Sequence, residues 1–219
     1  GLGDVYKRQS APWWRRWPEQ WIYPLQTICC LGMLWQRRNY YEFEWKLTSI
    51  LCGAVFGAVG IGFWLLPTTL YDHWQLNQDP EGWLKWLGVA ARHKGFDPQV
   101  LDHAWAVHCS LIFRFIRAAI VVAMVEEIFW RAFLMRYCMN PDGKYWSEPF
   151  GRASWRSYAI VTAAFVLAHA PIDYAAALVY GSLTYILCVW TKNLSACVSM
   201  HATANFLMGC YIMKYLSLI

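Results

Sequence analysis

The sequence has little charge. Only 15% of its 219 residues are Asp, Glu, Lys or Arg, against about a quarter in an ordinary soluble domain. The net charge of +5 comes from Lys and Arg residues scattered between apolar stretches, whereas nucleic-acid-binding proteins gather their basic residues into a patch. These features argue against a soluble domain of ordinary composition and against a nucleic-acid partner.

Familiar metal and redox motifs are missing as well. The eight cysteines form no CxxC pair, so we interpret them as small buried apolar residues and not as zinc ligands or redox centres. The sequence contains no HExxH, the zinc-protease motif that one helix can supply alone. No internal repeat is evident.

What the sequence has in abundance is apolar and aromatic residues. They make up 58% and 18% of the chain, with 15 tryptophans, and tryptophan gathers where a bilayer meets water. The apolar stretches approach the length of about 20 residues that spans a membrane. We therefore expect an all-α, polytopic transmembrane bundle of about 6–8 helices. The expected helices cover roughly residues 21–35, 47–66, 104–139 (as two helices that join near 117–124), 157–169, 172–190 and 194–216.

Two features refine this expectation. Gly53 and Gly57 form a GxxxG spacing that permits close helix packing in lipid, and Pro67 is expected to end the same helix. The polar stretch 68–103 should be a connection, with a short amphipathic surface helix near residues 83–87. The opening GLGDVYKRQ has no apolar character, and residues 1–12 are expected to be a non-native or disordered start. Residues 13–219 are then one membrane domain, expected to be truncated at one or both ends.

Glu126 and Glu127 are conspicuous because ionisable side chains within apolar helices are costly and tend to mark function. Arg131 follows Glu127 by four residues, so the two can pair on one helix face. Glu126 points about 100° away from that face and is left as a candidate general base. The alternative is that both glutamates are solvated at a helix end.

Three further polar residues occur in apolar segments. His169 precedes Pro171 and is expected to share a face with Phe165, either as a core residue or as a functional one. His201 and Asn205 are four residues apart and therefore share a helix face. They could donate hydrogen bonds to one oxygen, as an oxyanion hole requires, or could join helices. A metal such as Zn²⁺ stays open, with Glu126, His169 and His201 as ligands if one is present.

The ordered motifs at 126–131, 165–169 and 201–205 resemble those of the CAAX protease and bacteriocin-processing (CPBP or ABI) family of intramembrane proteases. The stretch RAAIVVAMVEEIFWRAFLMRY, with WIYPLQT and GFDPQVL, is most similar to the exosortase-associated CAAX prenyl protease-related subgroup. Met124 departs from that subgroup, where proline is expected. The resemblance covers the chain from about residue 17 onward, and relatives with about eight spans imply that this chain is a fragment.

The resemblance implies an endopeptidase mechanism. Glu126 and His169 would activate a water molecule, His201 and Asn205 would stabilise the oxyanion, and Glu127 and Arg131 would orient the site and balance its charge. The implied substrate is a membrane-associated protein or peptide, and the implied location is a bacterial inner membrane with a link to an exosortase system. Two other functions stay open: an ion- or proton-coupled transporter, and a non-catalytic immunity or scaffold protein.

Overall fold

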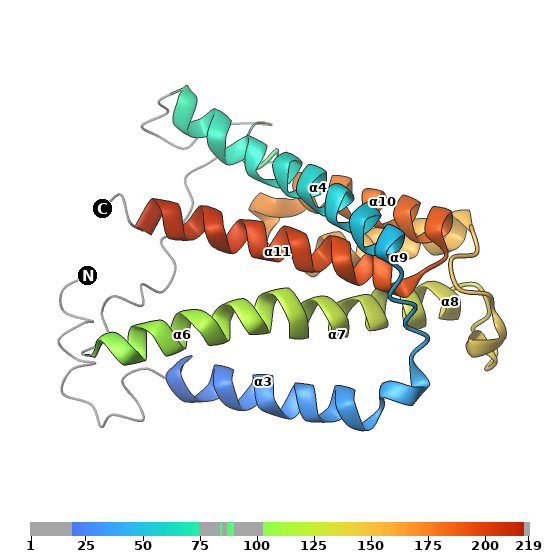
Figure 1. The fold of residues 1–219 in the computed structure, drawn as a ribbon. Helices are drawn as coiled ribbons and strands as arrows, with labels where there is room; N and C mark the ends of the chain where they lie inside the picture. The colour runs from blue at the N-terminus through green and yellow to red at the C-terminus, as the bar shows by residue number, and fades with distance from the viewer. Residues whose placement is uncertain (1–18, 75–83, 85–86, 90–102, 217–219) are drawn as a thin grey trace.

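The protein is a bundle of helices (Figure 1). The computed structural model describes residues 19–74, 84, 87–89 and 103–216, and no strand occurs among them. The expected start segment 1–12 lies outside these residues, as does most of the expected surface helix at 83–87. The long helices of the described chain are α3 (Glu19–Gln36), α4 (Leu47–His73), a continuous helix from Ala104 to Tyr137, α9 (Trp155–Leu167), α10 (Tyr174–Thr191) and α11 (Leu194–Leu216).

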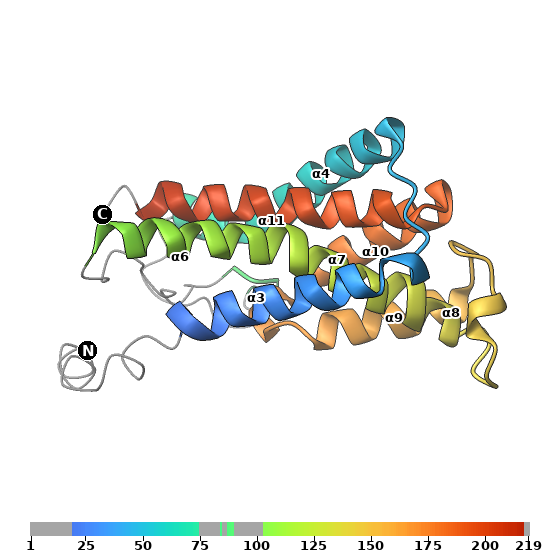
Figure 2. The same ribbon diagram turned by 60° about the horizontal axis from the view of Figure 1, so that its bottom comes forward.

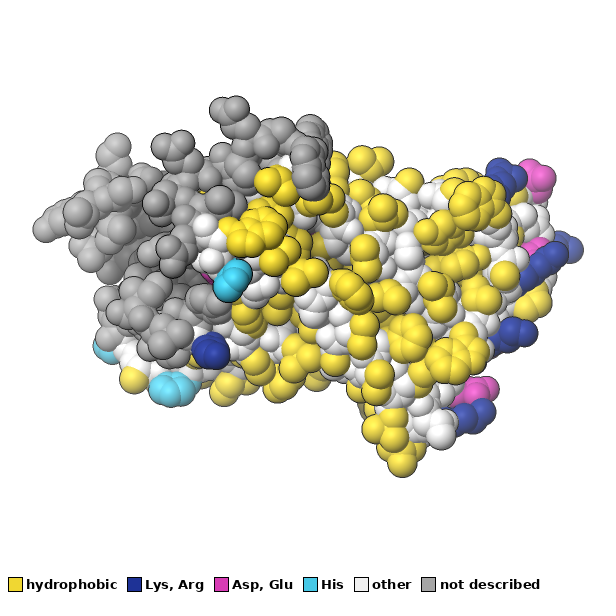
Figure 3. Space-filling model, turned by 90° about the horizontal axis from the view of Figure 1, so that it is seen from above, with side chains coloured by type: hydrophobic (Ala, Val, Ile, Leu, Met, Phe, Trp, Pro, Cys, Tyr) yellow, Lys and Arg dark blue, Asp and Glu magenta, His cyan; other side chains and the backbone are white. Residues whose placement is uncertain are grey.

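Three of these helices are long and apolar enough to cross a membrane: α4, Ala104–Tyr137 and Pro171–Thr191. Their outward faces are apolar, as α4 illustrates with the exposed side chains of Leu51, Val55 and Val59. In the space-filling view, apolar side chains cover the middle of the molecule and most charged ones gather at one end (Figure 3). An apolar surface of this size is unfavourable in water and favourable in contact with lipid. The protein is an integral membrane protein with an all-helical fold, as the sequence predicts.

The expectation that Pro67 ends its helix is wrong. Helix α4 continues through Pro67 to His73, so the polar connection begins later than residue 68. Proline is tolerated inside membrane helices because neighbouring groups can satisfy the backbone that it leaves unpaired. Two residues after the proline, the Thr69 hydroxyl donates to the carbonyl of Leu66 at 2.8 Å.

The expected break near residues 117–124 is also wrong. The chain runs as one helix of 34 residues from Ala104 to Tyr137. Its regular α-helical parts, α6 (Ala104–Ile116), α7 (Ala123–Glu127) and α8 (Met135–Tyr137), alternate with the π-helical segments η3 (Arg117–Val122) and η4 (Ile128–Leu134). A break within lipid would leave backbone groups without hydrogen bonds. Wider π turns change the helix without interrupting it, and η3 occupies most of the expected joint.

Helix α11 lies between α4 and the long helix in both ribbon views (Figures 1 and 2). Its contact with α4 is close, because a Cβ atom added at Gly53 or Gly57 would collide with the backbone oxygen of Ala196 or Met200. The GxxxG prediction is therefore confirmed. The Ser199 hydroxyl also donates to the Ile50 carbonyl across this contact at 2.8 Å.

The interpretation of the cysteines as buried residues is only partly confirmed. Cys138, Cys188 and Cys197 are buried, whereas Cys29, Cys109 and Cys210 are exposed on the helix surfaces. Exposure of this kind is compatible with lipid contact, because an uncharged thiol behaves as a small apolar group.

Candidate active site

The two glutamates lie on α7, a short α-helical stretch with a π-helical segment on either side. Such π turns often occur at functional sites, because they change the direction of side chains without ending the helix. Met124, at the position where the resembling subgroup has proline, is part of this uninterrupted helix. The substitution therefore leaves the glutamates on regular helical backbone.

Glu127 is fully buried and sits between two partners. Its Oε2 lies 3.6 Å from Nε of Arg131, which is itself 1% exposed, so the predicted ion pair is confirmed. Its Oε1 lies 2.9 Å from Nδ1 of His201, on α11. An isolated carboxylate would be costly here, and the arginine compensates its charge. Glu127 thus joins the long helix to α11 and fixes the ring of His201.

The hydrogen bond to Glu127 determines which nitrogen of His201 faces the rest of the site. A carboxylate only accepts hydrogen bonds, so Nδ1 must carry the proton that it donates. The other nitrogen, Nε2, lies 4.0 Å from Oε2 of Glu126. The Glu126 side chain is 40% exposed, in contrast to its buried neighbour. Glu126 can therefore reach water while it faces the free nitrogen of a fixed histidine.

Asn205 is held one turn beyond His201. Its side-chain Nδ2 donates to the backbone carbonyl of Ala118 at 2.8 Å. Ala118 belongs to the π-helical segment η3. This bond orients the Asn205 amide, whose Nδ2 carries a second hydrogen. The structure places Asn205 and His201 on the same helix as expected, and each is anchored by a different part of the long helix.

None of the described contacts joins His169 to Glu126 or Glu127. His169 follows the end of α9. The sequence predicted a helix to residue 169, but the helix stops at Leu167. The nearby Pro171 accounts for this, because the residue before a proline is disfavoured in helical conformation. Its Nδ1 lies 2.7 Å from the carbonyl of Phe165. A carbonyl only accepts, so Nδ1 donates and Nε2 is left as the acceptor.

A series of aromatic contacts connects the two histidines. The Trp64 ring packs edge-on against His169 with centroids 5.2 Å apart, and Tyr180 packs edge-on against both Trp64 and His201. The sequence does not indicate a role for Trp64 or Tyr180. No signal distinguishes them in a chain with 15 tryptophans and 13 tyrosines.

The candidate metal ligands do not form a metal site in this arrangement. Within the described part of the chain, no three His, Cys, Asp or Glu side chains are grouped to hold an ion. Glu126 and His201 face each other, but no described contact joins His169 to either.

The structure gives little support for a cysteine nucleophile at Cys138, which directly follows the long helix. Cys138 lies just beyond the span, and burial raises the pKa of its thiol while Arg156 opposes the shift. A thiol with a raised pKa is a poor nucleophile because less of it is thiolate.

Residues 108–207 match the family model of the Type II CAAX prenyl endopeptidase Rce1-like proteins. The match includes all three motif segments, at 126–131, 165–169 and 201–205. It supports the CAAX-protease family for the chain and, with it, a membrane-bound peptidase. No curated protein matches the chain, and no solved structure does.

Proposed function

We propose that the protein is an intramembrane endopeptidase of the CAAX-protease type. The observation that carries the proposal is the pair formed by Glu126 and His201, in which Oε2 of the glutamate lies 4.0 Å from Nε2 of the histidine. The buried Glu127 fixes the histidine ring through its other nitrogen, Nδ1. An exposed carboxylate that faces an oriented imidazole suits acid–base chemistry on a bound peptide. The family match supports the same activity.

In the proposed reaction, Glu126 takes a proton from a water molecule, and the water oxygen attacks the peptide carbonyl. The carbonyl oxygen becomes an oxyanion, stabilised by Asn205 and by Nε2 of His201. That role for Nε2 requires the doubly protonated ring, which lies between the carboxylates of Glu126 and Glu127. When the C–N bond breaks, Glu126 returns the proton to the leaving amine. One water is consumed, and a carboxylic acid and an amine are formed.

His169 is proposed as the second member of the water-activating pair. The support is its free Nε2 and its place in the matched segment. Its aromatic contacts with Phe165 and Trp64 hold the ring at the end of α9. Glu127 and Arg131 are proposed to orient the site and balance its charge.

The substrate is proposed to be a membrane-associated protein or peptide. The matched family acts on prenylated CAAX sequences by its description, so a prenylated peptide is one candidate. A bacterial inner-membrane location and a link to an exosortase system rest on the resemblance of the sequence alone and stay predictions.

The test is cleavage of membrane-anchored peptides by the purified protein in detergent, with products identified by mass spectrometry. The panel would contain prenylated CAAX peptides, the same peptides without the prenyl group, and unrelated lipid-anchored peptides. His201→Ala is the inactive comparison. Asp142→Asn, an exposed acidic residue in the loop after α8, is the matched control. Cleavage that persists in His201→Ala would contradict the proposed site.

A further inference from the structure

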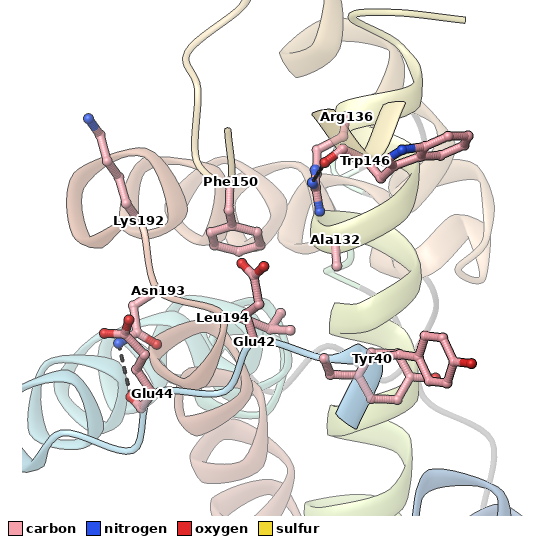
Figure 4. Close-up of a pocket in the computed structure, with 11 residues that line it drawn as sticks. Tyr40, Glu42, Glu44, Ala132, Arg136, Trp146, Phe150, Lys192, Asn193 and Leu194 are labelled. Carbon is pink, nitrogen blue, oxygen red and sulfur yellow. Dashed lines mark hydrogen bonds between the residues drawn. The ribbon is translucent and has the colours of Figure 1, made fainter. Parts of the chain in front are cut away.

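The charged end of the bundle is hollowed, and none of the candidate catalytic residues lines the hollow. A cavity of about 340 Å³ opens there between the loop after α3, the end of the long helix, the loop before α9 and the turn between α10 and α11 (Figure 4). Its lining includes Glu42, Arg136, Phe150 and Leu194. The proposed catalysis uses none of these residues.

The cavity lies at one end of the candidate spans, where the boundary between bilayer and water is expected. Glu44 comes three residues before the start of α4, Arg136 is in the last turn of the long helix, and Lys192 directly follows α10. Each of the three candidate spans therefore has one end at the cavity. Exposed aromatic side chains surround this end, as they do at membrane interfaces; they are Trp35, Tyr40, Trp45, Trp146, Trp155 and Trp190.

Two opposite charges face the cavity without pairing with each other. In the close-up the carboxylate of Glu42 points towards the Phe150 ring, and the guanidinium of Arg136 turns towards Ala132 (Figure 4). No described contact engages the Glu42 carboxylate, and Glu42 is exposed. Lys192 points away from this space in the same view.

Arg136 is fixed by the protein and keeps donor capacity. Its Nε donates to the Glu148 carbonyl at 2.8 Å, and its Nη2 donates to the Trp146 carbonyl. These bonds hold the guanidinium in place, and Nη1 has no partner among the described contacts. A guanidinium fixed in this way is suited to phosphate, which it binds by directional hydrogen bonds.

We propose that this cavity binds the headgroup of a zwitterionic phospholipid, which carries a phosphate and an ammonium on one short chain. The phosphate would bind Arg136, and the ammonium would lie against the Glu42 carboxylate and the Phe150 ring, because ammonium groups are attracted to aromatic faces. A purely anionic headgroup would leave Glu42 without a counter-charge. The location of the cavity favours a lipid over a soluble molecule with the same two groups.

The test is lipid retention by the purified, delipidated protein, measured by native mass spectrometry. Phosphatidylethanolamine and phosphatidylglycerol are titrated separately, because both carry phosphate and only the first carries an ammonium. The expected result is preferential binding of phosphatidylethanolamine, weakened about tenfold in Glu42→Gln. Binding of phosphatidylglycerol should not change in that variant, and Asp142→Asn should behave as the unmodified protein.

Soluble phosphoethanolamine identifies the source of the ligand. If it displaces the lipid, the headgroup alone is recognised; if it does not, the acyl chains are needed too, and both results support the site. Equal binding of the two lipids by the unmodified protein, or unchanged phosphatidylethanolamine binding in Glu42→Gln, would overturn the proposal. Because no peptide cleavage is measured, the outcome is independent of the proposed protease activity.

Discussion

Helix α11 meets α4 on one face and the long helix on another, and the two contacts are made of different residues. Towards α4 it presents backbone and small side chains at Ala196, Ser199 and Met200, which fit against the glycines of α4. Towards the long helix it presents His201 and Asn205, which bind Glu127 and the Ala118 carbonyl. One helix thus contributes both to close packing in lipid and to the candidate site.

The difference shows how a membrane protein can support buried charge. The α4 contact needs no ionisable group, since close approach of backbones is sufficient for association in lipid. The other contact includes a carboxylate, a guanidinium and an imidazole whose burial is costly unless they remain together. Substitutions on the two faces should therefore have different consequences.

The largest effect is expected for Glu127→Gln. The change leaves the Arg131 guanidinium buried without its counter-charge, and breaking such a pair costs about 3–5 kcal/mol. Thermal unfolding in detergent, followed by circular dichroism, should show a clear loss of stability together with a loss of peptide cleavage. The adjacent Glu126→Gln is the matched control, because its side chain is 40% exposed and its loss should leave the unfolding temperature unchanged. Equal destabilisation by both changes would contradict the distinction between the two glutamates.

His169→Ala should lower peptide cleavage by about 10²–10⁴-fold, the usual contribution of an acid–base group. The ring lies beyond the end of α9 and only partly inside the protein, so the variant should remain folded and inserted in the membrane. The comparison is with Phe165→Leu, which alters the packing around His169 but keeps the imidazole. A His169→Ala variant that cleaves at the normal rate would remove this residue from the proposed mechanism.

Asn205→Ala should lower kcat by about 10²–10³-fold with little change in KM, since an oxyanion donor acts mainly in the transition state. Steady-state kinetics on the best substrate of the peptide panel gives the two constants. A change confined to KM would instead assign Asn205 to substrate binding. Unchanged kinetics with reduced stability would restrict its role to the bond with Ala118.

The smallest effect is expected on the packing face. Gly57→Ala places a methyl group against the Met200 carbonyl, and such overpacking typically costs about 1–3 kcal/mol. Gly62→Ala on the same helix meets nothing within 4 Å, so it should be neutral or slightly stabilising, as alanine favours helix over glycine. The two unfolding temperatures test the contact directly. The account of the α4 contact fails if Gly57→Ala is as stable as Gly62→Ala.

Local patterns in the sequence predicted much of this arrangement. Apolar stretches predicted the helices, the spacing of Glu127 and Arg131 predicted their ion pair, and the GxxxG spacing predicted close packing. These relations involve residues of one helix, where the helical repeat fixes the geometry. The continuity of α4 through Pro67 and of the long helix through the expected joint was not predicted, because both depend on how lipid and neighbouring helices satisfy the backbone.

Hydrogen bonds between residues of different helices could not be predicted from the sequence. Glu127 and His201 are 74 residues apart, and nothing in either segment indicates which of the two glutamates bonds to the histidine. The bond from Asn205 to Ala118 involves a backbone carbonyl, which residue type cannot reveal. The roles of the site residues therefore stay predictions until activity is measured.

The most direct test of the central claim compares cleavage of one membrane-anchored peptide by the unmodified protein and by Glu126→Gln, each with and without a chelator. The account predicts cleavage by the unmodified protein and a loss of at least about 10²-fold in the variant, with the fold retained. The chelator arm shows separately whether a metal contributes. Cleavage by Glu126→Gln at the normal rate would contradict the account, because the carboxylate proposed to activate water would then be dispensable.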